Sequence, residues 1–202
     1  MNAVIEPLAR LFAHLQTGGP VMMPLVGVSV VMWTLILNHA LYFRRLYGKN
    51  MSRRMAGELV QAGTPPDPAK YRGATSLLVT EFLQLRSGDS AVDRSILDET
   101  VIRLNRRLDR HLGIIGVLAG VAPLLGLLGT VTGMISTFDV ISLFGTGNAR
   151  AMAGGISEAL ITTQTGLFVA IPGLYMWNFL TRRAQNLKER IASLGIYLKR
   201  YV

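Results

Sequence analysis

The hydrophobic residues of the chain gather in three long blocks, 20–43, 112–138 and 155–180. Each block approaches or exceeds the roughly 20 apolar residues that a helix needs to cross the hydrocarbon core of a membrane. The segments 44–111 and 181–202 are instead polar and rich in charge. The pattern therefore predicts an all-α integral membrane protein with three transmembrane helices and long helices that extend into the cytoplasm.

The polar segment 44–111 is expected to hold two or three helices. Gly63-Thr64-Pro65-Pro66 divides it, and Asp67 and Pro68 suit the start of the next helix. In the last of these helices, apolar residues recur every three or four positions from Leu97 to Ile115. Because no helix breaker interrupts this repeat, we expect one helix that runs past the basic residues into the second span.

Two further segments complete the predicted order. In 1–19, apolar residues fall on one helical face, which favours an amphipathic helix on the outer membrane surface or, equally, a short helix packed on neighbouring loops. Segment 139–154 contains the turn residues Gly145-Thr146-Gly147-Asn148 and is predicted to be a periplasmic loop. Segment 181–202 is predicted to be a cytoplasmic helix.

The distribution of basic residues predicts the orientation. The chain has 21 Lys+Arg against 12 Asp+Glu, a formal net charge of +9. Apart from Arg10 and Arg150, all the basic residues lie in the two polar segments, on one side of a three-span arrangement. This asymmetry is the positive-inside pattern, so it explains the charge without nucleic acid. It predicts a periplasmic N-terminus and a cytoplasmic C-terminus in a bacterial inner membrane, with membrane lipids as neighbours.

The residues that usually carry enzymatic chemistry are sparse. The chain has no cysteine, and its three histidines, His14, His39 and His111, are scattered. No metal-ligand spacing is present and no nucleophile lies beside a base. We therefore expect neither an enzyme nor a bound metal or cofactor. The chain also lacks a basic region before 20–43, so this block is interpreted as a retained span.

Small residues follow one side of the second span. Gly126, Gly129 and Gly133 recur at spacings of three and four residues, with Thr130 and Thr137 among them. Such a pattern lets two helices approach closely in lipid. A helix-packing face and a polar conduit both remain open as interpretations.

Polar side chains are concentrated in the third span. Glu158 and Thr162 to Thr165 would be costly against lipid, where an unpaired acid is disfavoured by several kcal/mol. They must therefore face protein or water. On an ideal helix Glu158, Thr162 and Thr165 form one stripe, whereas Thr163 lies well round from it. One face is thus expected to line a pore and the other to meet a neighbouring helix.

Two hydroxyl groups are predicted to lie at a similar depth. Thr130 follows Arg110 by 20 residues and Thr163 precedes Arg182 by 19. At about 1.5 Å per residue, both lie roughly 30 Å from the cytoplasmic charge. Two antiparallel helices would bring both hydroxyls to one level, where a ring of them could pass protons or hydrated ions.

One motif in the second span and one, in two parts, in the third carry a recognisable resemblance. The runs APLLGLLGTV (122–131), GISEALITT (155–163) and GLFVAIP (166–172) resemble the MotA/TolQ/ExbB proton channel family, with three spans closer to ExbB and TolQ than to four-span MotA. By position, the resemblance implies that Thr130 and Thr163 are pore hydroxyls, that Glu158 lies near the outer mouth, and that Pro172 is the family's third-span proline. Thr162 departs from the small apolar residue usual there, which leaves proton and sodium both open.

The resemblance also implies the assembly. Members form a homopentamer around the single membrane helices of two ExbD- or TolR-like subunits, and ion flow drives a TonB- or TolA-like protein. The three spans contain no aspartate, so the titrating acid would come from such a partner. The alternatives are a membrane scaffold or assembly protein without ion conduction, and a sodium-driven MotA-like stator.

Overall fold

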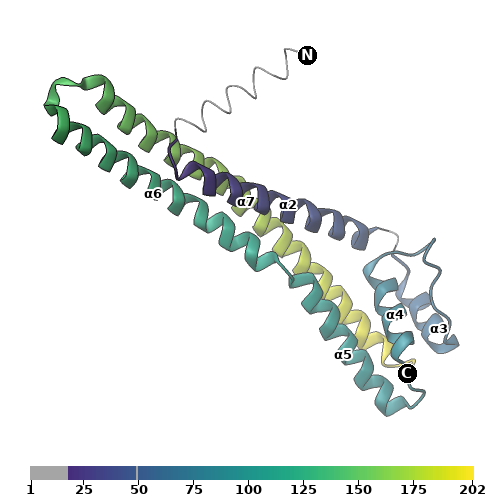
Figure 1. The fold of residues 1–202 in the computed structure, drawn as a ribbon. Coiled ribbons are helices and arrows are strands. Elements are labelled where there is room, and N and C mark those ends of the chain that lie inside the picture. The colour runs from purple at the N-terminus through teal and green to yellow at the C-terminus, as the bar shows by residue number, and fades with distance from the viewer. Residues whose placement is uncertain (1–17, 49) are drawn as a thin grey trace, which may run out of the picture. The chain divides into compact units, whose positions relative to one another are not determined.

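The computed structural model describes residues 18–48 and 50–202. The helices, in chain order, are α2 (Met22–Tyr47), α3 (Arg53–Ala62), α4 (Ala74–Leu85), α5 (Ser90–Asp109), α6 (Leu112–Phe144), the 3-10 turn η1 (Gly145–Gly147) and α7 (Ala149–Leu198) (Figure 1). No described residue belongs to a strand. The helix expected within 1–19 lies outside the described residues except at its last two positions.

Three of the described helices are long and apolar enough to cross a membrane. They are α2, the stretch that contains α6, and α7. This confirms the prediction of an all-α membrane protein with three spans. The exposed face of α6 carries large apolar residues such as Leu124, Leu127 and Phe138, as a helix surrounded by acyl chains requires.

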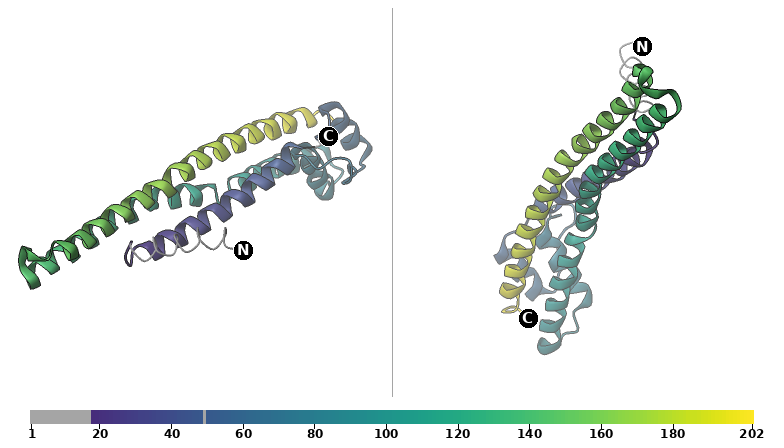
Figure 2. Two further views of the ribbon diagram at one scale, coloured as in Figure 1. Left: turned by 90° about the horizontal axis from the view of Figure 1, so that it is seen from above. Right: turned by 90° about the vertical axis from the view of Figure 1, so that its left-hand side faces the viewer.

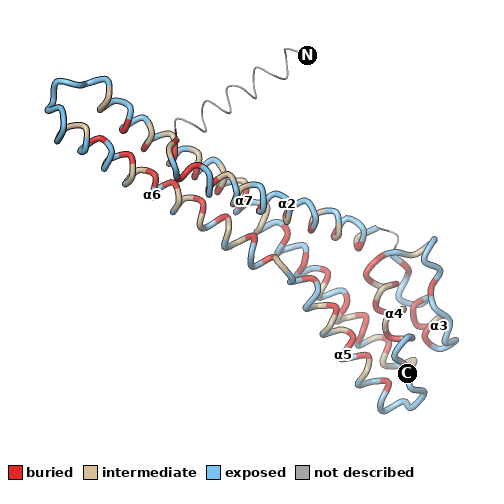
Figure 3. The backbone as a smooth tube through the Cα atoms, in the orientation of Figure 1, coloured by how far each residue is buried: buried red, intermediate tan, exposed pale blue. Residues whose placement is uncertain are grey.

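The chain forms two compact units. The first holds the described residues up to Ile36 together with Ile114–Trp177, and the second holds Leu37–Gly113 and Asn178–Val202. In the first, α6 and α7 run side by side from the turn at η1, and the opening turns of α2 pack on them (Figures 1 and 2). Buried residues follow the inner faces of these helices, and exposed residues follow the outer faces (Figure 3).

The second unit packs α3, α4 and α5 with the ends of α2 and α7. Its core is made of completely buried side chains, among them Phe43, Phe82, Leu104 and Leu187. The α3 helix is capped at its start by Ser52, whose hydroxyl accepts from the Met55 N–H. It ends at Gly63, whose φ of 66° lets the last carbonyls of the helix be capped.

The expected continuous helix from Leu97 to Ile115 is wrong at one point. Helix α5 ends at Asp109 and α6 begins at Leu112, with His111 between them in the left-handed conformation (φ 67°). A residue with a Cβ adopts that conformation at a cost of about 1–2 kcal/mol. The His39 ring offsets part of this cost, because its Nε2 donates to the Arg110 carbonyl at 2.6 Å and its edge packs on the His111 ring.

A buried carboxylate holds the turn between α4 and α5. Asp93 is 1% exposed and accepts hydrogen bonds from the Ser87 N–H and hydroxyl, from the Gly88 N–H and from the Arg86 guanidinium. Arg86 also donates to the Val60 carbonyl at 2.8 Å, which ties α3 to the same turn. The backbone groups that this turn leaves unpaired are thus satisfied by one side chain.

The pKa of Asp93 follows from this environment. Burial by itself raises the pKa of the carboxyl, but the hydrogen bonds from Ser87, Gly88 and Arg86 favour the charged form and hold the pKa below its ordinary value of 3.8. Because the pKa is lower in the folded state, the stabilisation is complete above the ordinary pKa and is lost as pH falls through the folded one. The contribution of Asp93 should therefore disappear only below about pH 4.

Asp93→Asn is expected to lower the free energy of unfolding at neutral pH. The amide keeps the shape of the side chain but loses the charge and sets an N–H₂ group against two of the four donors, which costs about 1–3 kcal/mol. Thermal unfolding of the purified protein in detergent measures this. Asp98→Asn is the matched control, since its ion pair with Lys199 is exposed and such pairs contribute about 0–1 kcal/mol. Equal losses of stability in the two variants would contradict this role of Asp93. So would a stability difference between Asp93→Asn and the unmodified protein that persists at acidic pH.

Candidate functional site

The interface between α6 and α7 is built on glycine. A Cβ added to Gly129 would lie 2.4 Å from the Thr162 side chain, and one added to Gly133 would lie 2.7 Å from the Gly155 carbonyl. At Gly126 the nearest atoms are α7 backbone at 3.2 Å. These three predicted packing residues therefore lie where the helices approach most closely, and any larger residue would push the helices apart.

Thr163 links the two helices directly. Its hydroxyl is 3.1 Å from the Gly126 carbonyl across the interface and 3.1 Å from the Ala159 carbonyl of its own helix. The side chain is half-buried. One hydroxyl proton can serve only one of these acceptors at a time, so the group can switch partners while its lone pairs stay free to accept.

Thr162 lies inside the protomer. Its side chain is fully buried, fills the space left by Gly129, and donates to the Glu158 carbonyl at 2.5 Å. The Gly18 carbonyl lies 3.3 Å from the same hydroxyl. The stripe of Glu158, Thr162 and Thr165 expected from an ideal helix is therefore divided, with Thr162 taken up by packing. A role for Thr162 in ion passage stays a prediction.

Thr130 and Thr165 are half-buried and hydrogen-bonded within their own helices. The Thr130 hydroxyl donates to the Leu127 carbonyl at 2.6 Å, and the Thr165 hydroxyl to the Ile161 carbonyl at 2.8 Å. Since Thr163 lies opposite Gly126 and Thr162 opposite Gly129, the register places Thr130 and Thr163 within about one helical turn, roughly 5 Å, along the hairpin.

The Glu158 carboxylate lies against the turn that precedes α2. A Cβ added to Gly19 would lie 1.7 Å from Oε1 of Glu158, and Gly19 itself has a φ of 67°. Only glycine meets both demands without strain. The sequence analysis did not assign Gly18 or Gly19 to the site. The available signal was the Gly18-Gly19-Pro20 run directly before the first span.

Pro172 and Gly173 belong to a second region of close packing in α7. Pro172 lies inside the helix, where it removes one backbone donor. A Cβ added to Gly173 would lie 2.6 Å from the sulfur of Met32 and 3.3 Å from Ala119. The first span thus touches the hairpin at this level, and the turn before it does so at Gly18 and Gly19.

Together these residues place separate polar groups within an apolar hairpin. Glu158, Thr163 and Thr130 contribute a carboxylate and two hydroxyls, and each hydroxyl already has a backbone acceptor. A hydroxyl that is hydrogen-bonded to its own helix tolerates an apolar environment. Its lone pairs can still accept a hydrogen bond from water or contact a cation. Among the described residues no group of three His, Asp or Glu is placed to hold a metal ion.

Comparison with known protein families identifies the family that carries this α6–α7 hairpin. A sequence model described as the MotA/TolQ/ExbB proton channel family matches residues 70–193. The chain belongs to this family. The match covers α6 and the part of α7 that carries Glu158, Thr162, Thr163 and Thr165, so all the predicted site residues lie within it.

Two individual members of the family are similar over most of the chain, and a third over less than half of it. The ExbB-like 1 protein of Synechocystis sp. is 30% identical over 199 residues, which cover 94% of this chain and 78% of the relative. The biopolymer transport protein ExbB of Salmonella typhimurium is 31% identical over 189 residues, 87% of this chain and 77% of the relative. ExbB of Aquifex aeolicus reaches 41% over 84 residues, 42% of this chain and 57% of its own length. This family member is therefore ExbB-like.

Proposed function

We propose that the chain is the channel-forming subunit of an inner-membrane motor that couples ion flow to work in the cell envelope. The observation that carries the proposal is that three polar groups, those of Glu158, Thr163 and Thr130, lie in a tightly packed pair of spans. A relative named for biopolymer transport is 31% identical over 87% of this chain. The role is that of a conduit and transducer, not of an enzyme.

These polar groups suit a ring of subunits. In one protomer Thr163 reaches the Gly126 carbonyl, and Thr130 lies about one turn away. Repeated around a homopentamer, these hydroxyls would surround a central space with donors and acceptors that replace water. Glu158, the only carboxylate of the third span, would attract cations at one end of that space.

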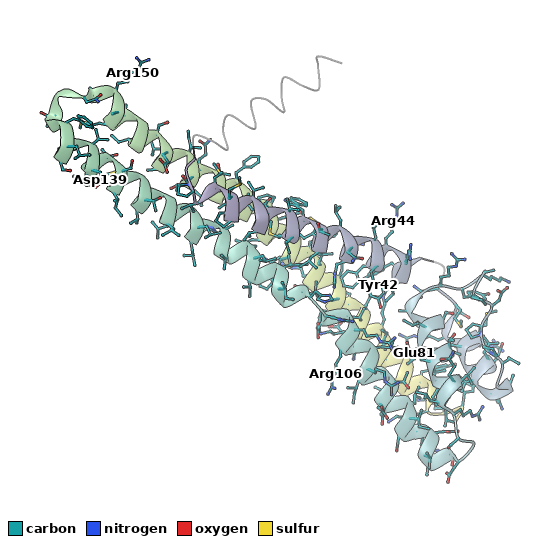
Figure 4. The ribbon with its side chains drawn as sticks, in the orientation of Figure 1. Tyr42, Arg44, Glu81, Arg106, Asp139 and Arg150 are labelled. Carbon is teal, nitrogen blue, oxygen red and sulfur yellow. The ribbon has the colours of Figure 1, made fainter. Side chains whose placement is uncertain are left out.

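The ring would need an acid from another chain. None of the three predicted spans contains an aspartate, and Asp139 lies in the last turns of α6, close to η1, where it is exposed (Figure 4). We propose that two copies of an ExbD- or TolR-like single-span subunit occupy the central space and supply the titrating carboxylate. A TonB- or TolA-like protein would receive the output.

Protons are the proposed coupling ion. A sodium ion takes several oxygen ligands, whereas here Thr162 is fully buried against Gly129, which leaves the hydroxyls of Thr130, Thr163 and Thr165 for this path. A chain of hydroxyls and water suits proton transfer. In a cell that depends on this complex, a protonophore should abolish output and removal of sodium should not. The reverse result would favour a sodium-driven, MotA-like stator.

The proposed topology has the η1 turn in the periplasm and the polar segment 44–111 in the cytoplasm. Because the chain has no cysteine, single substitutions can report this without background. A cysteine at Asn148 is expected to react with a membrane-impermeant maleimide in intact cells, and one at Ser95 only after the inner membrane is opened. Labelling of Ser95→Cys in intact cells would reverse the orientation.

Complex formation with a single-span subunit is the direct test of the proposed motor function. Co-expression with a candidate single-span subunit should give a complex that survives purification, with more copies of this chain than of the partner. A chain that stays partnerless with every such subunit would point to the second candidate, a scaffold.

The glycine face at Gly126, Gly129 and Gly133 favours that alternative, because it explains close packing without conduction. A scaffold's output should also be insensitive to protonophores.

A further inference from the structure

One face of α2 changes from apolar to cationic near the end of the helix. Leu37 and Leu41 are 58% and 59% exposed, and Arg44 and Arg45 continue the same helical face at the next turn. Figure 4 shows Arg44 projecting from α2. A helix face of this kind matches the boundary at which acyl chains give way to phosphate headgroups.

A hollow opens beside these arginines. It has a volume of about 530 Å³ and lies between the end of α2 and the start of α4. Arg44, Arg45 and Arg72 line it, together with Tyr42 and the apolar side chain of Leu77. No carboxylate contributes to the lining. The hollow is therefore a cationic space with one hydroxyl and an apolar wall.

The three arginines have no acidic partner among the described residues. Arg72 donates from Nε to the Pro68 carbonyl at 2.9 Å, which leaves its terminal amino groups available. By contrast, Arg86 and Arg107 are paired with Asp93 and Glu81. Guanidinium groups bind phosphate through paired hydrogen bonds, so three unpaired ones around one hollow favour a phosphate-bearing ligand.

We propose that this hollow binds the headgroup of an anionic phospholipid. The apolar face at Leu37 and Leu41 leads directly to Arg44 and Arg45 and would carry the acyl chains, which a free phosphate lacks. A lipid held in this way would join the end of α2 to the start of α4. The proposal rests on the membrane location of the family and not on ion conduction, so the two can fail separately.

Lipid binding by the purified full-length protein tests the proposal. Native mass spectrometry in a neutral detergent would compare phosphatidylglycerol with phosphatidylcholine, for the unmodified chain and for the triple variant Arg44→Gln, Arg45→Gln, Arg72→Gln. The triple variant is expected to lose at least about tenfold in affinity for phosphatidylglycerol, since each cation near a membrane surface contributes measurably to anionic-lipid binding. Binding of phosphatidylcholine should not change.

A second triple variant controls for net charge. Arg53→Gln, Arg54→Gln and Arg94→Gln remove three exposed arginines of α3 and α5 that do not line the hollow. This variant should keep affinity for phosphatidylglycerol within about threefold of the unmodified chain. An equal loss in both triple variants would show charge attraction without a site and would overturn the proposal.

Further measurements distinguish a lipid from a soluble anion as the ligand of the hollow. Inorganic phosphate and glycerol phosphate should compete only weakly, and Leu41→Gln should weaken lipid binding without affecting those soluble anions. Competition by phosphate at the affinity of the lipid would overturn the lipid assignment. If the triple variant unfolds, Arg72→Gln alone, on the α4 side of the hollow, gives the same test, and unchanged lipid binding in it would overturn the site.

Discussion

Replacement of Glu158 by glutamine, or of Thr163 by valine, is expected to reduce the energised output to that of cells without the chain. Glutamine keeps the size of Glu158 beside Gly19 but removes its charge. Valine keeps the shape of Thr163 and removes the hydroxyl that reaches the Gly126 carbonyl. Both changes act on the proposed path and leave the packing in place. Complementation of a deletion strain measures the output.

The control for this prediction is Thr132→Val. The Thr132 hydroxyl donates to the Gly129 carbonyl of its own helix at 3.0 Å and lies outside the proposed path. Its output should be close to that of the unmodified chain, and all three variants should still assemble with the single-span partner. Normal output from both Glu158→Gln and Thr163→Val would remove these residues from the mechanism while leaving the fold and the family untouched.

Replacement of Gly133 by valine is expected to disrupt the α6–α7 hairpin. The new Cβ would lie 2.7 Å from the Gly155 carbonyl and 2.8 Å from the Ala159 nitrogen, both backbone atoms that cannot move aside alone. Overpacking of a core costs about 1–3 kcal/mol, and a clash with backbone falls at or above the upper end. The variant should accumulate poorly and lose its thermal transition in detergent.

Gly120→Val is the matched control in the same helix. A Cβ at Gly120 has no atom within 4 Å in the protomer, so valine there should change stability by no more than about 0.5 kcal/mol. Size-exclusion chromatography with a fluorescent fusion compares the two variants at equal expression. Similar profiles for Gly133→Val and Gly120→Val would mean that the helices do not pack as closely as Gly133 and Gly155 require.

Much of the arrangement could be predicted because it depends on local pattern. Three apolar blocks of membrane length predict three spans, since backbone groups in lipid must be satisfied within a helix. The spacing of Gly126, Gly129 and Gly133 predicts a face of close approach, because these positions coincide on a helix. Neither inference needs knowledge of the neighbouring helix.

Other features depend on contacts between distant residues. The break at Arg110 and His111 has no Gly or Pro to mark it, and the His39 ring that caps it is 71 residues away in the chain. The contact of Glu158 with Gly19 likewise joins the third span to the turn before the first. Periodicity describes one helix at a time, so it could predict neither.

The amino-acid sequence alone determined the helical class, the number of spans, the asymmetry of charge and the family, because each depends on composition or on short-range order. Only the tertiary structure decided which threonine faces which neighbour. Thr162 and Thr163 are adjacent and chemically identical, yet the packing of Gly129 encloses the first while the Gly126 carbonyl engages the second. That difference arises from the register of α6 against α7, which steric contact across the interface sets.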